Sequence, residues 1–375
     1  MARVLVAGTY DPEFPRNKRL GLLLSAAGHD VSTCQVDLWG ADRYEIPNQR
    51  KGRVVARALL AYPRLVWRFL RSPRPDLVLV GYPGWFDMVV LAPLARIRRL
   101  PVLFDPFISL FDTVVADRRL TTAGSLLGRA CKLGDKVSLR LARRALADTP
   151  SHADYYASLA GIDRERIGVV WLGAQDDVFG PRPEITPVPR RVLFHGTFIA
   201  LQGIDTILRA AKLLEGDDVE VRIIGSGQEQ PMVDALIEEL RPANVVLVGR
   251  VPLEQVPLEI AAATLCLGIF GTTDKASRVV PNKVFECTAV GRPVVTADTP
   301  AMRSAFSSAE VAMVPAGDPG ALAHEVRRLL DDADAREALA QAAHERYVAS
   351  YATGPLTVAL AEQVRLAVPE VPRGH

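Results

Sequence analysis

Residues 191–227 read RVLFHGTFIALQGIDTILRAAKLLEGDDVEVRIIGSG and contain one complete β-α-β pattern. An apolar run at 191–198 ends in a glycine turn, and a segment with helical periodicity follows at 203–215. A second apolar run at 219–227 ends in another glycine turn. Short Val- and Leu-rich strands that alternate with amphipathic helices are typical of parallel α/β units. The stretch therefore predicts a parallel sheet covered by helices.

The same alternation extends over the whole chain in two series. The first series of predicted strands covers residues 2–8, 30–36, 76–82, 101–106, 145–150 and 168–173. The second covers 191–198, 219–227, 244–250, 264–270, 293–298 and 310–317. A proline-rich stretch at 180–190 separates them and is typical of a linker.

The length of the chain points in the same direction. Because 375 residues exceed a usual single core, two domains are expected. We predict an N-terminal Rossmann-like domain at 1–180 and a C-terminal one at 181–354. A closing helix and tail at 355–375 are predicted to return to the first domain.

The charge is unevenly distributed. The net charge is +2, but residues 1–150 carry 24 Lys/Arg and 13 Asp/Glu, which gives +11, whereas the remainder carries 21 and 30, which gives −9. A basic half joined to an acidic half suggests that the basic half binds something anionic. The overall composition, 49% hydrophobic and 23% charged, is that of a soluble globular protein.

Cysteine usage and apolar runs bear on location. The four cysteines are scattered without a CxxC pair, which favours buried, reduced thiols and argues against a zinc site. The N-terminal segment reads as a first strand and is too short an apolar run for a signal peptide. No apolar stretch approaches the span of a bilayer. These features predict a cytoplasmic protein.

Ligands of parallel sheets bind beyond the carboxyl ends of the strands, so candidate site residues follow the predicted strands. In the first half, Gly8 permits a close backbone approach and Arg16 could meet an anion, although a simple turn explains both equally well. Asp105 directly follows a buried strand and could orient or deprotonate a hydroxyl. The alternative for Asp105 is a turn or helix-capping role.

In the second half, Gly196 and the amides after it could line a diphosphate, because such NH groups have no internal partner. His195 beside it is equally typical of a packing residue. The sequence GSGQEQ at 225–230 resembles a dinucleotide fingerprint but lacks its third glycine. It predicts a turn where a base or ribose approaches the backbone.

The stretch KASRVVPNKVFE at 275–286 is the most informative. Three cations converge on one predicted helix start: Lys275, Arg278 and Lys283. A helix N-terminus with cations suits a nucleotide diphosphate as the leaving group, and Glu286, one turn into the helix, would accept hydrogen bonds from ribose hydroxyls.

A purely structural alternative exists for this stretch. In it, Asn282 caps the helix and Glu286 forms an ion pair with Lys283 or Arg292, which stabilises a surface by only about 0–1 kcal/mol. Because the residues around Glu286 are apolar, a functional role for Glu286 is favoured over a surface ion pair without function.

Two other sequence patterns have both a functional and a structural explanation. Asp332 and Asp334 form a DxD, as in many metal-dependent sugar transferases, but they lie between two helical segments, where acidic residues favour a helix start. The run Arg50–Arg74 carries eight Arg/Lys, three aromatic residues and no acid. It is either a membrane-surface patch or a solvated helix face with core aromatics. No nucleic-acid module surrounds it, which argues against nucleic-acid binding.

From 191 to 332 the chain resembles the retaining family-4 (group 1) nucleotide-sugar glycosyltransferases. The similar segments are HGTFIALQGIDTILRAAKLL, VRIIGSGQ, VVLVGRV and VPNKVFECTAVGRPVVTAD. RPDLVLVGYPG and LADTPSHADYY extend the resemblance across the first domain. The resemblance implies the GT-B fold: two Rossmann-like parallel-sheet domains facing an interdomain cleft.

The resemblance also implies roles. Glu286 matches the second glutamate of the family's paired motif, which holds the ribose, while the first glutamate is replaced by Arg278. The family's diphosphate-gripping arginine and lysine are replaced by Thr197 and Gln202. We interpret these departures as a relocated diphosphate grip, or, for Arg278, as contact with an acidic donor sugar. Asp105 occupies the place of a family histidine or aspartate near the sugar and acceptor.

The resulting assignments combine both lines of reasoning. They are Asp105 for catalysis; Gly8, Thr9, Gly196, Thr197, Lys275, Arg278, Asn282 and Lys283 for the donor diphosphate; Gly225, Ser226, Arg250 and Glu286 for the nucleoside; and Tyr10, Arg16 and Asn17 on the acceptor side. No metal site and no cofactor are expected.

The expected activity is transfer of a sugar from a nucleotide-diphosphate sugar to an acceptor hydroxyl, with retention. The acceptor would be a lipid-linked, cell-envelope or exopolysaccharide glycan, reached at the inner face of a membrane through Arg50–Arg74. Two alternatives remain open: a sugar-nucleotide epimerase or hydrolase of the same fold, and a non-catalytic partner subunit, which the replaced family residues would fit.

Overall fold

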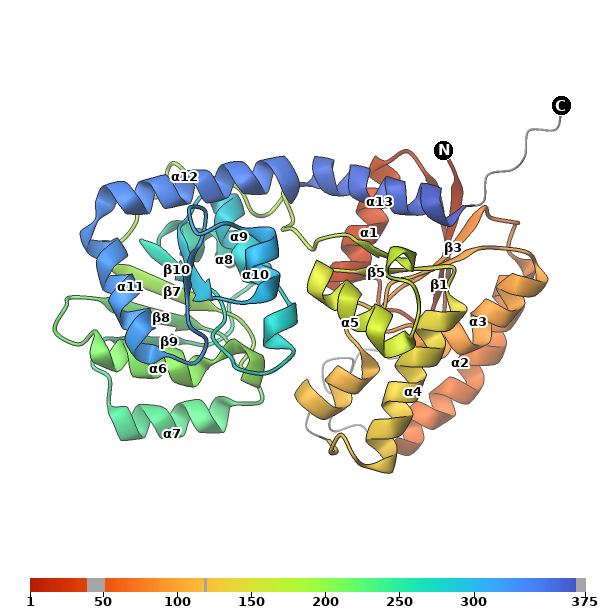
Figure 1. Ribbon diagram of the computed structural model, residues 1–375, viewed down its shortest axis with the longest axis horizontal. Coiled ribbons are helices and arrows are strands. Elements are labelled where there is room, and N and C mark those ends of the chain that lie inside the picture. The colour runs from red at the N-terminus through yellow and green to blue at the C-terminus, as the bar shows by residue number, and fades with distance from the viewer. Residues whose placement is uncertain (39–50, 118–119, 369–375) are drawn as a thin grey trace. The chain divides into compact units, whose positions relative to one another are not determined.

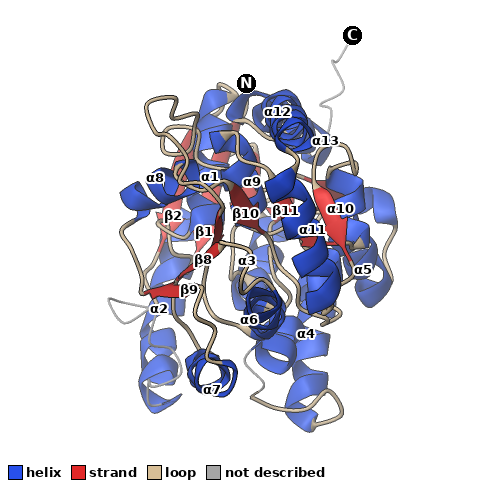
Figure 2. Cartoon of the chain, turned by 90° about the vertical axis from the view of Figure 1, so that its left-hand side faces the viewer, coloured by secondary structure: helices blue, strands red, loops and turns tan. Residues whose placement is uncertain are grey.

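The computed structural model describes residues 1–38, 51–117 and 120–368. The chain divides into two compact units, each with its own sheet (Figures 1 and 2). Unit 1 contains Met1–Trp171 and the segment from Leu356 onward, and unit 2 contains Leu172–Pro355. All twelve strands expected from the sequence are present.

Unit 1 contains a six-stranded parallel sheet in the order β2-β1-β3-β4-β5-β6. Its strands are β1 (Arg3–Gly8), β2 (Asp30–Gln35), β3 (Leu77–Val80), β4 (Val102–Phe104), β5 (Arg144–Ala147) and β6 (Ile167–Val169). The central strand β3 is the apolar run LVLV and is buried along its whole length. Such runs are typical of strands in parallel sheets, because helices cover both faces.

Helices cover both faces of this sheet. They are α1 (Pro15–Ala26), α2 (Lys51–Arg71), α3 (Trp85–Ile97), α4 (Leu126–Leu141), α5 (Pro150–Ala160) and α13 (Thr353–Ala367). The helices α2 to α5 pack against one face of the sheet, and α1 and α13 pack against the other. A π-helical segment, Asp112–Asp117, precedes α4, and a short 3₁₀ helix, Arg164–Arg166, precedes β6.

Unit 2 repeats the architecture with the strand order β12-β11-β10-β7-β8-β9, again fully parallel. Its strands are β7 (Arg191–His195), β8 (Glu220–Ile224), β9 (Val245–Val248), β10 (Leu265–Leu267), β11 (Val294–Ala297) and β12 (Ala312–Val314). The stretch at 191–227 forms β7, α6 and β8, with Phe194 paired to Ile223 across the sheet.

The helices of unit 2 are α6 (Ile204–Leu213), α7 (Gln230–Leu240), α8 (Val256–Ala261), α9 (Asn282–Val290), α10 (Pro300–Ala305), α11 (Pro319–Asp331) and α12 (Ala333–Ser350). Three 3₁₀ helices join them at Ala200–Gln202, Leu253–Gln255 and Ala276–Arg278. The helices α6, α7 and α11 share one large apolar core with β7 and β8. The helix α9 packs against α8 and α12 and follows the connection from β10.

The proline-rich stretch at 180–190 lies inside unit 2, because the chain passes from one unit to the other at Trp171 and Leu172. Two hydrogen bonds of Val188 explain its place. The Val188 amide donates to the Ala262 carbonyl at 2.9 Å, and the Thr264 hydroxyl donates to the Val188 carbonyl at 2.8 Å. The stretch therefore packs at the entry to β7 and β10.

The DxD pattern of Asp332 and Asp334 lies at a helix start, which confirms the structural explanation given from the sequence. Asp332 is the N-cap of α12, and its carboxylate accepts a hydrogen bond from the Ala335 amide at 2.9 Å. The described residues contain no group of three or more His, Cys, Asp or Glu side chains that could hold a metal ion.

The four cysteines are buried free thiols, as expected. Within the described part of the chain, no helix is both long enough and apolar enough to cross a bilayer.

Candidate functional site

In unit 2 the candidate site begins at the N-terminus of α9. Pro281 occupies the N-cap position and offers no side-chain hydrogen bond to the first turn. The capping role considered for Asn282 is wrong, because Asn282 is the first helical residue. Its amide oxygen is buried and has no hydrogen-bond partner among the described residues. The first amides of α9 therefore lack a side-chain cap, and such amides favour an anion.

Lys283, the next residue, is almost completely buried. Its side chain is 5% exposed, its Nζ donates to Gln202 Oε1 at 2.5 Å, and the same atom lies 3.6 Å from the centroid of the Phe194 ring. No ion pair joins it to a carboxylate in the described part of the chain. Burial lowers the pKa of Lys283 well below its ordinary value, against the opposing effect of Cys287 and Glu286.

Gly196, at the end of β7, lies directly over this ammonium. A Cβ at Gly196 would stand 2.9 Å from Lys283 Nζ, and the residue has φ +154°, which side chains rarely adopt. The positive φ therefore favours a glycine here, and the absence of a side chain leaves room for the Lys283 ammonium beside the turn after β7.

Glu286 lies one turn farther along α9, and its partner is not the one considered from the sequence. Glu286 Oε2 lies 2.8 Å from His195 Nε2, and the carboxylate side chain is 18% exposed. The structural alternative, an ion pair of Glu286 with Lys283 or Arg292, is wrong. Lys283 contacts Gln202, and Arg292 donates to the Ala261 carbonyl at 2.6 Å. His195 therefore joins the end of β7 to α9.

The other two cations differ in their exposure. Lys275 is 4% exposed and precedes the 3₁₀ helix that ends at Arg278. Arg278 is partly exposed. Of the three cations expected to converge, two are therefore buried ammonium groups and one is a partly exposed guanidinium.

The turns after β7 and β8 pack against each other. A Cβ at Gly225 would stand 1.9 Å from the Gly196 carbonyl oxygen, so this glycine permits the contact between the two turns. Arg250, after β9, donates to the Ser226 hydroxyl at 2.8 Å. Thr197, which replaces the family arginine, is exposed at the β7 turn. The structure thus places the part of the diphosphate set at the β7 turn next to the part of the nucleoside set that follows β8 and β9, all within unit 2.

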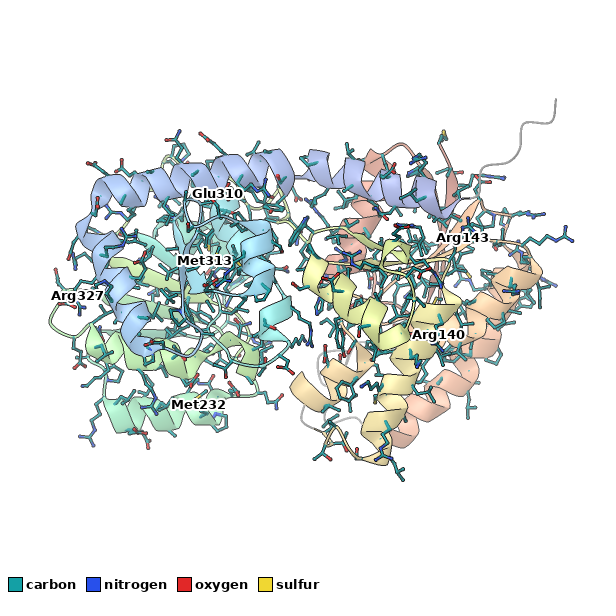
Figure 3. The ribbon with its side chains drawn as sticks, viewed as in Figure 1. Arg140, Arg143, Met232, Glu310, Met313 and Arg327 are labelled. Carbon is teal, nitrogen blue, oxygen red and sulfur yellow. The ribbon has the colours of Figure 1, made fainter. Side chains whose placement is uncertain are left out.

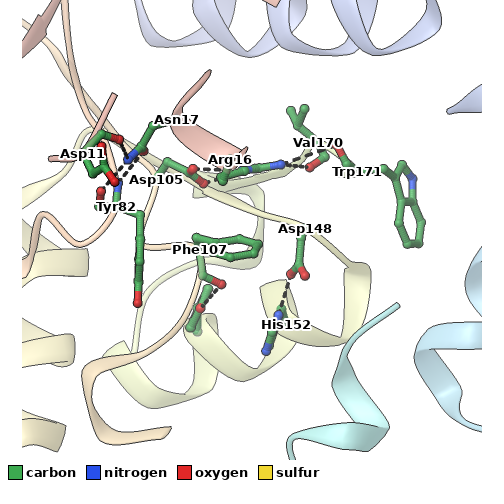
Figure 4. A network of polar contacts seen from close by, with 11 residues as sticks. Asp11, Arg16, Asn17, Tyr82, Asp105, Phe107, Asp148, His152, Val170 and Trp171 are labelled. Atoms are coloured by element: carbon green, nitrogen blue, oxygen red, sulfur yellow. Dashed lines mark hydrogen bonds and ion pairs between the residues drawn. The ribbon is translucent and has the colours of Figure 1, made fainter. Parts of the chain in front are cut away.

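In unit 1 a buried ion pair lies at the carboxyl ends of the strands (Figure 4). Arg16 donates to both Asp105 oxygens, at 2.9 and 3.1 Å, and to the Val170 carbonyl at 2.7 Å. The Arg16 and Asp105 side chains are 1% and 0% exposed. Asp105 was expected to face a hydroxyl, but both of its oxygens are bound by Arg16.

A second buried pair, which the sequence interpretation missed, lies beside it. Asp148 Oδ1 is 2.5 Å from His152 Nδ1, and Thr149, between them, caps α5 (Figure 4). His152 Nε2 is buried and has no hydrogen-bond partner among the described residues. The imidazole stacks on Tyr156, with 5.5 Å between the ring centroids. An aspartate at a strand end followed four residues later by a histidine was the available signal.

Gly8 and Thr9 enclose another missed carboxylate, Asp87 in the first turn of α3. The Thr9 amide donates to Asp87 Oδ2 at 2.7 Å, and a Cβ at Gly8 would stand 2.5 Å from the same oxygen. Burial raises the pKa of Asp87, against the opposing hydrogen bonds from Thr9 and Tyr62. The glycine of this turn is therefore explained by a buried carboxylate.

The remaining acceptor-side residues are also engaged within unit 1. The Asn17 amide nitrogen donates to the carbonyls of Asp11 and Tyr82, at 2.9 and 2.7 Å (Figure 4). Tyr10 is 5% exposed, and its carbonyl accepts from Gln35 Nε2 at 3.0 Å. These contacts give both residues a structural role. Their assignment to the acceptor stays a prediction.

Comparison with known proteins relates both halves of the chain to glycosyltransferases. Residues 189–332 match the family model described as "Glycosyl transferases group 1", and residues 9–173 match a "Glycosyl transferase 4-like domain". A curated relative, the D-inositol 3-phosphate glycosyltransferase of Thermobispora bispora, is 28% identical over 261 residues. That alignment covers 64% of this chain and 60% of the relative's length.

Solved structures with the same fold cover almost the whole chain. Sucrose-phosphate synthase from Thermosynechococcus elongatus aligns with a TM-score of 0.74 at 16% identity, over 97% of this chain and 98% of that protein. HepE of Anabaena in complex with UDP aligns with a TM-score of 0.72 at 15% identity, over 98% and 100%. HepE was also solved with UDP-glucose. The chain belongs to the group 1 glycosyltransferases and has their GT-B fold.

Proposed function

We propose that this glycosyltransferase transfers a sugar from a nucleotide-diphosphate sugar to an acceptor hydroxyl with retention of configuration, and that unit 2 binds the donor. The UDP and UDP-glucose bound by HepE, a protein of the same fold, support a nucleotide-sugar donor. The family relationship supports glycosyl transfer over epimerisation or a non-catalytic role.

One observation carries the assignment of the donor site. Lys283 is a buried ammonium with a neutral amide and an aromatic face as its neighbours, and it lies beside the uncapped start of α9. A buried cation without a counter-ion is costly, and an anionic ligand would offset that cost. The diphosphate of a nucleotide sugar carries the required charge.

The contact between Lys283 and Gln202 also explains why the family lysine can be absent. The family places its diphosphate lysine at the position of Gln202, and here the ammonium of Lys283 is hydrogen-bonded to that glutamine. On this proposal, the ammonium of Lys283 takes the place of the family lysine at the β7 turn. During transfer, Lys283, the α9 amides and Arg278 would stabilise the charge that develops on the leaving diphosphate.

Glu286 is proposed to hold the ribose. His195 binds one of its oxygens and so fixes the carboxylate at the end of β7, while the side chain stays partly exposed. The turn residues Gly225 and Ser226, with Arg250, are proposed to flank the nucleoside.

In unit 1 Asp105 stays the proposed catalytic residue, with Gly8 and Thr9 beside the diphosphate and Tyr10, Arg16 and Asn17 toward the acceptor. Because Arg16 binds both Asp105 oxygens, direct proton transfer through Asp105 requires that pair to open.

No metal and no cofactor are part of the proposal. The proposed acceptor is a lipid-linked or cell-envelope glycan, for which the basic first half of the chain is the support.

A panel of nucleotide sugars, screened by thermal stabilisation of the purified protein, tests the donor assignment. We expect one nucleotide sugar to raise the melting temperature more than the others, and we expect Lys283→Met to abolish that increase. NMR of the anomeric proton in the product of that donor then reports on retention. Absence of binding for every common donor would contradict the proposal, and release of nucleotide without any acceptor would indicate a hydrolase.

A further inference from the structure

The helix α2 has two apolar faces, of which only one is used inside the protein. Ala61, Leu65 and Phe69 recur every fourth residue and are buried against the sheet. On the other side Leu59, Leu60, Trp67 and Leu70 are 71, 70, 56 and 52% exposed. At about 100° per residue, these four positions fall within roughly 100° of the helix surface. They form a continuous apolar stripe outside the core.

Arginines line one edge of this stripe. Arg57, Arg64, Arg68 and Arg71 follow one another at spacings of seven, four and three residues, which places them in one row beside the apolar stripe. The Arg71 guanidinium lies over the Trp67 ring, 4.5 Å from its centroid. Arg68 donates to the Gln35 carbonyl at 2.8 Å and so connects the row to β2.

The neighbouring helix α3 continues the same surface, since it contacts both α2 and α4 in one layer (Figure 1). Phe86, Val89 and Ile97 are 63, 49 and 78% exposed, and they lie on one side of α3. Arg96 is exposed beside them.

The helix α4 adds a third apolar and basic stripe. Leu126, Leu127 and Leu133 are 86, 53 and 60% exposed, and Arg129 and Lys132 are exposed between them. Arg140, in the last turn of the same helix (Figure 3), has a different role. It donates to the Ala160 carbonyl at the end of α5.

The acidic residues of these three helices are few and inaccessible. Asp87 on α3 and Asp135 on α4 are 1% and 2% exposed, and α2 contains no acid. Every exposed charge described on α2, α3 and α4 is therefore positive. We call the exposed side chains of these three helices the outer helix face.

We propose that the outer helix face binds the surface of a bilayer that contains anionic lipid, with α2 lying in the plane of the headgroups. Large apolar side chains flanked by arginines, without acids, are the combination that inserts at the boundary between headgroups and acyl chains. When an arginine stacks on a tryptophan at such a surface, the guanidinium lies among the headgroups and the indole ring lies at the boundary with the acyl chains.

Charge decides against the main competing partners. A second copy of this chain that docked through the same face would bring two cationic surfaces together, which is unfavourable for a symmetric dimer. A nucleic acid would neutralise the arginines but would leave the exposed leucines in water. An anionic bilayer satisfies both the charge and the apolar side chains. This inference concerns a surface away from the donor site and does not depend on the donor assignment.

Vesicle flotation with the full chain tests the proposal. We expect the protein to float with vesicles of phosphatidylcholine and phosphatidylglycerol and to remain behind with phosphatidylcholine alone. The triple variant Leu59→Gln, Leu60→Gln, Leu70→Gln should bind the anionic vesicles at least about tenfold more weakly. A matched variant, Leu213→Gln, Leu253→Gln, Val358→Gln, replaces exposed apolar residues elsewhere and should bind like the wild type.

Trp67 supplies a second readout that depends on depth. Brominated acyl chains quench tryptophan only when the ring reaches them, so quenching should occur with anionic vesicles and should be lost in Trp67→Phe. Melting temperatures of all variants show whether the exposed substitutions leave the fold intact.

Several results would overturn the proposal. They are equal binding to neutral and anionic vesicles, binding of the triple variant equal to that of the matched variant, and binding without Trp67 quenching. A dimer that depends on the outer leucines, seen by light scattering in the absence of vesicle binding, would assign the face to a second copy. Binding of a homopolymer RNA that the leucine substitutions do not change, without vesicle binding, would assign it to nucleic acid.

Discussion

The strand ends of the two units contain buried cations in opposite situations. In unit 1 the Arg16 guanidinium is completely buried and bonded to both oxygens of Asp105. In unit 2 the Lys283 ammonium is equally buried, but its neighbours are the Gln202 amide and the Phe194 ring. The first cation is neutralised within the fold, and the second is not. We interpret the difference as a structural role for the cation of unit 1, whereas the cation of unit 2 is the one proposed to bind an anionic ligand.

The largest expected effect is on the stability of unit 1. Arg16→Met leaves Asp105 as an uncompensated buried charge, and we expect the free energy of unfolding to fall by about 3–5 kcal/mol. Urea denaturation measures the loss. Adding Asp105→Leu should recover most of it, because a buried pair can often be replaced by apolar residues at small cost.

The surface pair of Arg365 with Glu362 supplies the control. Its guanidinium is 64% exposed, so Arg365→Met should change stability by less than about 1 kcal/mol. If Arg16→Met destabilises no more than Arg365→Met, the pair with Asp105 is not structural and the comparison between the units fails.

The second expected effect is on nucleotide binding in unit 2. Lys283→Met should weaken binding of a nucleoside diphosphate by about 2 kcal/mol, which is about thirtyfold, because the ligand loses a charge-assisted hydrogen bond. Without nucleotide, the same variant should be at least as stable as the wild type, since a buried unpaired charge has been removed. Calorimetric titration and thermal unfolding measure the two quantities.

Lys212 offers a matched substitution. It pairs with Glu215 at 2.7 Å and is 41% exposed, so Lys212→Met should leave nucleotide affinity unchanged. Equal affinities for Lys283→Met and Lys212→Met would remove Lys283 from the donor site.

A third prediction separates the ribose from the diphosphate. Glu286→Ala should weaken a nucleoside diphosphate by about tenfold, or about 1.4 kcal/mol, through loss of hydrogen bonds to the ribose. It should not weaken inorganic pyrophosphate, which has no ribose, whereas Lys283→Met should weaken both. Competition of each ligand against a fluorescent nucleotide gives the two ratios. Equal losses for both ligands in Glu286→Ala would place Glu286 at the phosphates.

The smallest effect is a pH dependence. Because burial lowers the pKa of Lys283, the ammonium of the free protein loses its proton at a lower pH than that of an exposed lysine. A bound diphosphate favours the charged form and raises that pKa, so binding should take up protons, and affinity should fall as the pH rises through the pKa of the free protein. Titrations in buffers of different ionisation enthalpy measure the uptake. A wild-type uptake that persists unchanged in Lys283→Met would contradict this assignment.

The fold was predictable because each strand and helix has a local pattern. The apolar run LVLV at 77–80 is typical of a buried strand, and the periodicity at 203–215 is typical of an amphipathic helix. Twelve predicted strands that alternate with such helices indicate two parallel sheets. Asp332 was predictable as a helix cap for the same reason, because capping is a local property.

The side-chain contacts in the two sites were not predictable, because each joins residues from distant parts of the chain. Glu286 meets His195 across 91 residues, and Arg16 meets Asp105 across 89. A single sequence does not state which cation lies opposite which carboxylate. Asp87 was missed for the same reason, because its partner Thr9 lies 78 residues away.

The central claim is that the diphosphate of the donor binds between the β7 turn and the start of α9. Amide hydrogen exchange of the full chain, with and without a saturating nucleoside diphosphate, tests it most directly. We expect slower exchange at 196–198 and 283–286, with little change at Arg16 and Asp105. Unchanged exchange in both unit 2 segments, under conditions where calorimetry shows the nucleotide to be bound, would contradict it.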